Sequence, residues 1–151
     1  ACAKSGHQPD IVYIRPVYLE ENESVIRREV EPYLLNFLAF NASPVESLQS
    51  EEKKAELRAK GYGFYASGAL ESLTRLTYEE IVEQEIGFIG TPKKVIAQIE
   101  NLQSRGGIGE LAIVANFGGI EHWKSIKTQQ LFAQQVMPAF RGAGQTSMAE
   151  R

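Results

Sequence analysis

Residues 86–119 read IGFIGTPKKVIAQIENLQSRGGIGELAIVANFGG, and this stretch decides the fold class. Thr91 can cap a helix, and Pro92 suits its first position because an N–H there would have no intrahelical partner. Apolar residues at 95, 96, 99 and 102 form one helical stripe, which glycines at 106 and 107 end. Residues 86–89 predict a short extended segment, and residues 110–115 predict a strand apolar enough to be covered on both faces.

An earlier strand is predicted at residues 10–19, which are rich in isoleucine, valine and tyrosine. Pro16 cannot donate a hydrogen bond to a neighbouring strand, so we expect pairing to be interrupted there, near the strand's end. Arg15 lies within this apolar run and needs a partner, because an unpaired buried charge is costly. A structural ion pair is the favoured interpretation, and an anionic ligand is the alternative.

A helix follows this strand, with Asn22 as its candidate N-cap and apolar residues at helical spacing up to residue 38. Pro32 interrupts the pattern, which predicts either a kink or two abutting helices. The aromatic side chains between residues 37 and 40 are expected to be buried.

Residues 41–76 form a long insertion of different character. A short solvated helix at residues 50–61 precedes a glycine-rich, aromatic stretch without a clear period. Tyr62, Phe64 and Tyr65 could form a lid with glycine hinges, and the alternative is a loop that packs its own aromatic rings.

Two further helices complete the prediction. A capping box at residues 77–80 opens a short helix to about residue 85, and a longer helix at residues 121–137 is stopped by Pro138. Residues 142–151 are mostly small and polar, and we expect them to be disordered. The predicted parallel strands lack the neighbours that such a sheet needs, so the sequence indicates an α/β fold that is incomplete in this chain.

Composition argues against several classes of function. Sixteen basic against nineteen acidic residues give the 151-residue chain a net charge of −3, which leaves no basic surplus for binding nucleic acid. No apolar run approaches the roughly 20 residues that a membrane helix needs. The single cysteine, Cys2, allows no intrachain disulfide, so we expect a reducing, cytoplasmic location. With only two histidines besides, a structural metal site is not expected.

No complete catalytic signature is present, so the candidate site rests on position in the fold. It consists of residues at the ends of two predicted strands, where α/β folds place ligands: Tyr18, Asn116, Phe117, Gly118 and Gly119. Paired glycines let a backbone approach a planar ligand, and Phe117 could line a pocket; the alternative is a tight turn with Phe117 in the core. His122, just beyond, is more simply a solvated residue than a general base.

These motifs, in this order, resemble the C-terminal end of the bacterial luciferase-like flavin-dependent monooxygenases. In that family a GTP turn opens the penultimate helix, a strand and a glycine-containing loop follow, and the last helix ends in a phrase similar to LFAQQVMP, here residues 131–138. Residues 6–23, GHQPDIVYIRPVYLEENE, are similar to the family's seventh strand with its acidic exit. The aromatic insertion lies where luciferases carry a mobile active-site loop. The resemblance covers nearly all of residues 5–141.

The resemblance implies a partial (β/α)8 TIM barrel, in which residues 1–141 form the last strands and helices around a lid-bearing insertion. It implies a parent monooxygenase that oxidises an aldehyde or similar small organic molecule with O2 and reduced FMN, with the deazaflavin F420 as the alternative cofactor. The strand-end residues would shape the flavin or substrate pocket. The family's phosphate-binding part and principal catalytic groups lie outside this segment, so the catalytic residues stay unassigned and the chain alone is expected to be inactive.

A second hypothesis belongs to another class of protein. The chain could be a noncatalytic, shortened barrel relative that pairs with itself or with another subunit through its unsatisfied strands. We expect either a dimer or an association with the missing part of the barrel, and no nucleic-acid or membrane partner. An unrelated small α/β enzyme is disfavoured, because no complete acid, base or nucleophile constellation is present.

Overall fold

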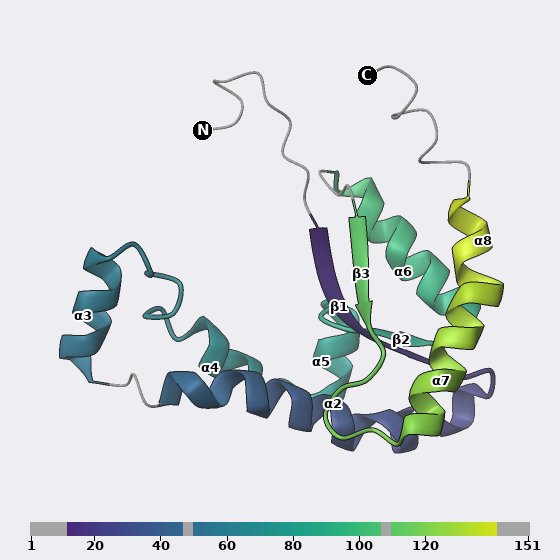
Figure 1. Cartoon of the computed structure of the whole chain (residues 1–151), viewed down its shortest axis with the longest axis horizontal. Helices are drawn as coiled ribbons and strands as arrows, with labels where there is room; N and C mark the ends of the chain where they lie inside the picture. Colours follow the sequence, from purple (N-terminus) through teal and green to yellow (C-terminus); the bar gives the residue numbers. More distant parts are fainter. Residues whose placement is uncertain (1–11, 47–49, 107–109, 142–151) are drawn as a thin grey trace.

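The computed structural model describes residues 12–46, 50–106 and 110–141, which form a small parallel sheet with helices packed around it (Figure 1). The strands are β1 (Val12–Leu19), β2 (Phe88–Gly90) and β3 (Glu110–Val114). The helices are α2 (Glu23–Glu46), α3 (Glu51–Ala59), α4 (Ala69–Leu73), α5 (Tyr78–Glu83), α6 (Pro92–Ser104), α7 (His122–Leu131), the π-helical segment η1 (Phe132–Val136) and α8 (Met137–Phe140). The α/β class and all three strands are confirmed. The predicted disordered tail, residues 142–151, lies outside the described residues.

The three strands are parallel, in the order β2-β1-β3. β1 pairs with β3 from Val12 to Pro16, which lies opposite Val114, so this pairing ends at the proline, where the sequence predicts an interruption. On its other side β1 pairs with β2 only over residues 17–19. The proline therefore lies where one edge of β1 has no described neighbour, and a strand tolerates a missing N–H at such an edge.

Two apolar clusters hold the sheet, one on each face. Side chains of β1 and β2 pack on one face against α6, α7 and η1; its buried members are Val17, Leu19, Phe88, Val95, Ile99, Leu102, Leu131 and Val136. Tyr18 and Ile89 pack on the other face against α2, α5 and the loop after β3, with Ile26, Val30, Leu34, Leu38, Ile81, Phe117 and Ile120. Because successive strand side chains point to opposite faces, β1 belongs to both clusters.

The amino-terminal half of the sheet is open on one face. Val12 is 49% exposed and Ile14 is 62% exposed, and Ala112, opposite Ile14 on β3, is exposed as well. The expectation that β3 is covered on both faces is therefore wrong for the described chain. The reason is the position of α2, which passes beneath the carboxyl ends of the strands in Figure 1 and leaves their first residues uncovered.

Helix α2 is one continuous helix, so the alternative of two abutting helices is wrong. The Asn22 side chain accepts a hydrogen bond from the Ser24 backbone N–H at 3.1 Å, as the predicted N-cap requires. Pro32 has no N–H to donate within the helix. The helix continues because Val30 and Leu34, on either side of the proline, are both buried in the core against the sheet. Phe40 is 77% exposed, which contradicts the expected burial of this aromatic side chain.

The last helical segment runs past the proline that was expected to stop it. Pro138 lies inside α8, and the chain stays helical to Phe140. The π-helical turn η1 immediately precedes it. A π turn shifts the hydrogen-bond pattern by one residue, which accommodates a position that cannot donate.

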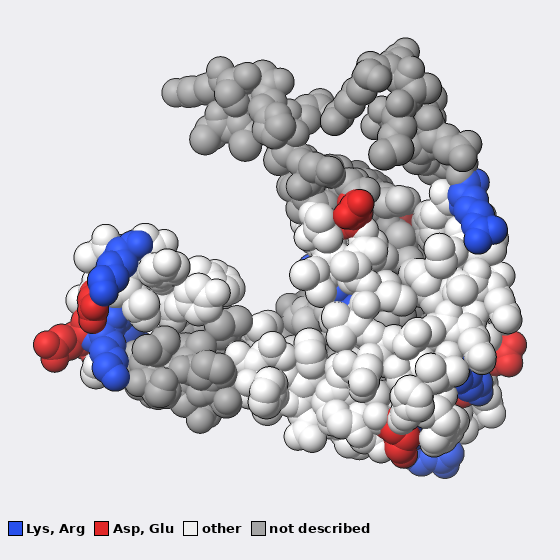
Figure 2. Space-filling view, in the orientation of Figure 1, with Lys and Arg blue, Asp and Glu red and all other residues white. Residues whose placement is uncertain are grey.

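The insertion forms an arm, defined here as residues 50–73, that stands away from the sheet (Figures 1 and 2). Ser50 caps α3 by accepting from the Lys53 N–H at 3.3 Å, and α3 has no buried residue. Charged side chains gather over α3 at the outer end of the arm in Figure 2, and α4 contacts α2 at its base. The capping box of Thr77 and Glu80 that opens α5 is confirmed.

Arg15 does not make the ion pair that the sequence favours. Its Nε donates to the Glu85 main-chain carbonyl at 3.1 Å, and its Nη1 donates to the Ile14 carbonyl at 3.0 Å. The Glu85 carboxylate instead accepts hydrogen bonds from Asn101, at 2.6 Å, and from Arg105. Main-chain carbonyls satisfy the half-buried guanidinium, so no carboxylate is needed at this position.

Glu20 joins the end of β1 to the two residues that precede α2 and to α7. Its carboxylate accepts from the backbone N–H groups of Glu21, at 2.8 Å, and Asn22, at 3.3 Å, and it pairs with the Lys127 ammonium. Burial raises the pKa of this carboxyl, but the Lys127 and backbone hydrogen bonds outweigh burial and hold the pKa below its ordinary value.

We expect Glu20→Gln to lower the free energy of unfolding by about 1–2 kcal/mol at pH 7, because it removes a charged acceptor from its partners. A depressed pKa stabilises the fold above the unfolded-state value, and this contribution is lost as the pH falls through the folded pKa. The difference between the two proteins, measured by urea unfolding, should therefore shrink below about pH 4. Glu100→Gln, an exposed change on α6, is the control; an equal effect of both substitutions would contradict the assignment.

Candidate functional site

The chain turns sharply after β3, between Phe117 and Ile120. The Ile120 N–H donates to the Phe117 carbonyl at 3.0 Å, and the two central residues, Gly118 and Gly119, have φ values of 60° and 84°. Positive φ at both central positions defines a type I′ turn, which glycine adopts without steric cost. The paired glycines predicted to form this loop are thus required by its backbone conformation.

This turn packs directly on the backbone of α2. A Cβ atom at Gly118 would lie 1.7 Å from the Tyr33 carbonyl oxygen, whereas a Cβ at Gly119 would meet nothing within 4 Å. The Asn36 side chain donates from Nδ2 to the Gly118 carbonyl at 3.3 Å. The close approach and the hydrogen bond together fix the turn on the helix.

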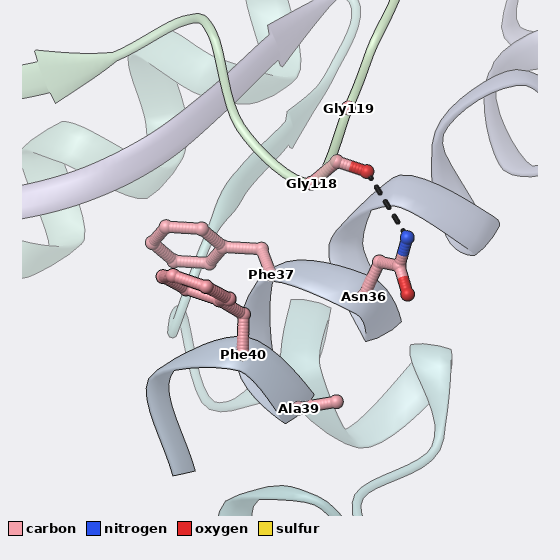
Figure 3. Close-up of a pocket in the computed structure, with 6 residues that line it drawn as sticks. All are labelled: Asn36, Phe37, Ala39, Phe40, Gly118 and Gly119. Carbon is pink, nitrogen blue, oxygen red and sulfur yellow. Dashed lines mark hydrogen bonds between the residues drawn. The ribbon is translucent and has the colours of Figure 1, made fainter. Parts of the chain in front are cut away.

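A half-open pocket of about 580 Å³ lies between the turn and α2 (Figure 3). It is lined by Asn36, Phe37, Ala39, Phe40, Gly118 and Gly119. Its volume falls within the range of roughly 300–1,000 Å³ that is usual for small-molecule sites. The pocket lies beyond the carboxyl end of β3, where the sequence places the candidate site.

The predicted site residues divide between this pocket and the core. Gly118 and Gly119 line the pocket, whereas Asn116 is exposed and outside its lining. Phe117 is buried and makes an edge contact with Phe37, with ring centroids 5.8 Å apart. Phe117 therefore lies in the core, which agrees with the alternative prediction of a tight turn with a buried Phe117. It contacts the pocket-lining residue Phe37.

Tyr18 is buried at the end of β1 and does not line the pocket. Its hydroxyl donates to Glu29 Oε2 at 2.6 Å. Burial, reinforced by this hydrogen bond to a carboxylate, raises the pKa of the hydroxyl far above its ordinary value. The hydroxyl thus links β1 to α2 through Glu29. Tyr18 was predicted to face a ligand, but it does not line the described pocket.

The three predicted lid residues lie on the arm. Tyr62, Phe64 and Tyr65 are exposed and contact one another, with the Phe64 and Tyr65 ring centroids 5.7 Å apart. They are not among the residues that line the pocket. A lid role for them stays a prediction.

Charged groups at the start of α7 contact Tyr33 of α2 but are not in the described lining of the pocket. Lys124 is buried, with its ammonium 3.1 Å from Glu121 Oε2 and 5.3 Å from the centre of the Tyr33 ring. The backbone N–H of Glu121, and then the Tyr33 hydroxyl and Lys124, lower the pKa of the Glu121 carboxyl. His122, at the first position of α7, is exposed, in keeping with the simpler interpretation of this residue.

Sequence reasoning missed the helical half of the pocket. Asn36, Phe37, Ala39 and Phe40 lie on α2, outside the motifs that point to the turn. Their spacing of i, i+1, i+3 and i+4 places them on neighbouring positions of one helix surface, beside the buried stripe. That spacing was the available signal, but it does not reveal which part of the chain lies opposite.

The residues that line the pocket do not fit the whole of FMN. None of them carries a positive charge to neutralise a phosphate, although the aromatic and glycine walls suit a flat ring. Within the described ranges, no group of three or more histidine, cysteine or acidic side chains is arranged to hold a metal ion. No helix in the same ranges is long and apolar enough to span a membrane.

Comparison with known proteins adds one fold relationship. No protein-family model and no curated protein matches the sequence. Among solved structures, the chain is similar to the monooxygenase RslO1 from Streptomyces bottropensis, with a TM-score of 0.56 and 20% sequence identity. The match covers 91% of this chain and 34% of RslO1, so the chain spans about a third of that protein's length. The two proteins share a fold over this part.

We expect Gly118→Ala to destabilise the fold much more than Gly119→Ala. Both substitutions place alanine in left-handed backbone, at a cost of about 1–2 kcal/mol. Only Gly118→Ala also drives a methyl group into the Tyr33 carbonyl, which adds roughly 1–3 kcal/mol or forces the turn off the helix. Thermal unfolding followed by circular dichroism measures both, and equal losses of stability would show that the close approach is not needed.

Proposed function

We propose that this chain is the C-terminal part of a luciferase-like, flavin-dependent monooxygenase and forms the last strands and helices of a (β/α)8 barrel. The observation that carries the proposal is the fold similarity over 91% of the chain to about a third of a protein named as a monooxygenase. The resemblance of the GTP turn, the glycine loop and the final helix to the luciferase-like family supports it independently of the structure.

The open parts of the sheet support a place in a larger barrel. β1 and β3 are adjacent and parallel, and the chain between them contains a covering helix, α6, as a barrel requires. The outer side of β3 has no described neighbour, and β1 lacks one beside residues 12–16 on its β2 side. Further parallel strands at these two edges would also bury Val12 and Ile14.

In the proposed enzyme this chain supplies one wall of the active site. The Gly118–Gly119 turn and the surface of α2 shape the pocket, and Asn36 provides its polar side chain. The remainder of the barrel would hold the phosphate of FMN, or of a deazaflavin, because the described lining has no cation for it. The bound flavin would supply the chemistry with O2, and the arm with Tyr62, Phe64 and Tyr65 would exclude water from it.

Titration with FMN, followed by quenching of flavin fluorescence, tests this assignment. We expect no tight binding of FMN to the chain alone, because the described lining has no cation for the phosphate. We expect saturable binding when residues 12–141 replace the matched third of RslO1 in one fused polypeptide, because the proposal places the flavin phosphate in the rest of such a barrel. Tight binding to the chain alone would contradict the proposal, and so would a fusion that folds, as judged by circular dichroism, but binds no FMN.

The noncatalytic alternative, a barrel relative that pairs with itself, is favoured by the exposure of Val12 and Ile14 beside an open strand edge. If this face mediates self-association, sedimentation should give a dimer whose dissociation constant rises about tenfold or more with Ile14→Glu, because the substitution buries a charge in the contact. Ile126→Glu, at an exposed position on α7, is the matched control and should leave the dimer intact. A monomer at all concentrations would eliminate the alternative.

A further inference from the structure

The pocket has the shape of a slot with one aromatic wall and one peptide wall. Phe37 and Phe40 project from α2 about one helical turn apart, and the small side chain of Ala39 points away from their rings (Figure 3). The opposite side is the main chain of Gly118 and Gly119, which carries no side chain. A peptide plane without side chains facing phenyl rings accepts a flat ligand more readily than a branched one.

Phe37 and the glycine turn are held in place before any ligand binds. The Phe37 ring is braced by the buried Phe117 ring in an edge contact with an interplanar angle of 66°. The turn is locked by its own hydrogen bond and by the packing of Gly118 on Tyr33. Phe40, in contrast, is largely exposed and can close over a bound ring. Such preorganisation lowers the entropic cost of binding.

One corner of the slot is polar. Asn36 is the polar side chain of the lining, and its Nδ2 already donates to the Gly118 carbonyl. The amide oxygen points away from that hydrogen bond in Figure 3 and retains its capacity to accept. The lining carries no charged side chain. The corner therefore suits a neutral donor, such as a hydroxyl or an N–H group, on the edge of the ligand.

We propose that this pocket binds a flat aromatic molecule with a hydroxyl or N–H donor on its edge, and that such molecules are the substrate class of the enzyme. The substrate role rests on the proposed function, whereas the binding itself depends only on residues of this chain. Flexible aliphatic chains gain no stacking between an aromatic ring and a peptide plane, so the slot favours aromatic over aliphatic molecules of similar size.

The test is a titration of this chain with 2-naphthol, followed by the fluorescence of the probe, with naphthalene and decan-1-ol as competitors. We expect saturable binding of 2-naphthol, several-fold weaker displacement by naphthalene, and little displacement by decan-1-ol. Phe40→Ala should weaken 2-naphthol binding by a few-fold to about tenfold, the value of one aromatic contact. Trp123→Ala removes an exposed aromatic side chain from α7, outside both the pocket lining and the arm, and should leave the affinity unchanged.

A second variant tests the polar corner. Asn36→Leu should bring the affinities for 2-naphthol and naphthalene to within about twofold of each other, because the hydroxyl then has no acceptor. The proposal fails if 2-naphthol does not saturate the chain, if decan-1-ol competes as well as naphthalene, or if Phe40→Ala and Trp123→Ala behave alike. Circular dichroism confirms that each variant is folded. This titration contains no flavin. Failure to bind 2-naphthol would therefore contradict the proposed ligand class, whereas the FMN titrations test the proposed function.

Discussion

The close packing of Gly118 on the Tyr33 carbonyl of α2 is the contact on which the candidate site depends. It brings the end of β3 against a helix that enters from the end of β1, and these segments are distant in sequence. Without that approach, Phe37 would lose its contact with Phe117 and no pocket would form. The glycine is required twice, by its left-handed backbone and by the absence of space for a side chain.

Helices cover the sheet unevenly, and this unevenness connects the fold to the proposed function. The carboxyl half of β1 is packed on both faces, whereas residues 12–15 are exposed or half-buried. Two polar interactions hold the packed half of β1 in place. Glu20 forms an ion pair with Lys127 of α7, and the Tyr18 hydroxyl donates to Glu29 of α2. The packed half of β1 lies against α2 and the loop after β3, which line the pocket. The open half presents strand edges of the kind that further barrel strands would occupy.

Where sequence reasoning was wrong, tertiary contacts overrode a local rule. Pro32 stays in one continuous helix because core contacts continue on both sides of it, and the chain stays helical through Pro138 after a π turn. Arg15 donates to the main-chain carbonyls of Glu85 and Ile14 rather than to a carboxylate. Glu85 is distant in sequence from the arginine that uses its carbonyl.

The sequence by itself determined the α/β class, the three strands, the capped starts of α3, α5 and α6, and the glycine turn after β3. These features depend on hydrophobic period, capping side chains and left-handed glycines, all of which act within a few residues. Only the tertiary structure decided that α2 lies opposite the turn, that Asn36 and Phe40 complete the pocket, and that Tyr18 and Phe117 are buried behind it. The reason is that a pocket is made by contacts between segments some 80 residues apart, and local patterns carry no record of such contacts.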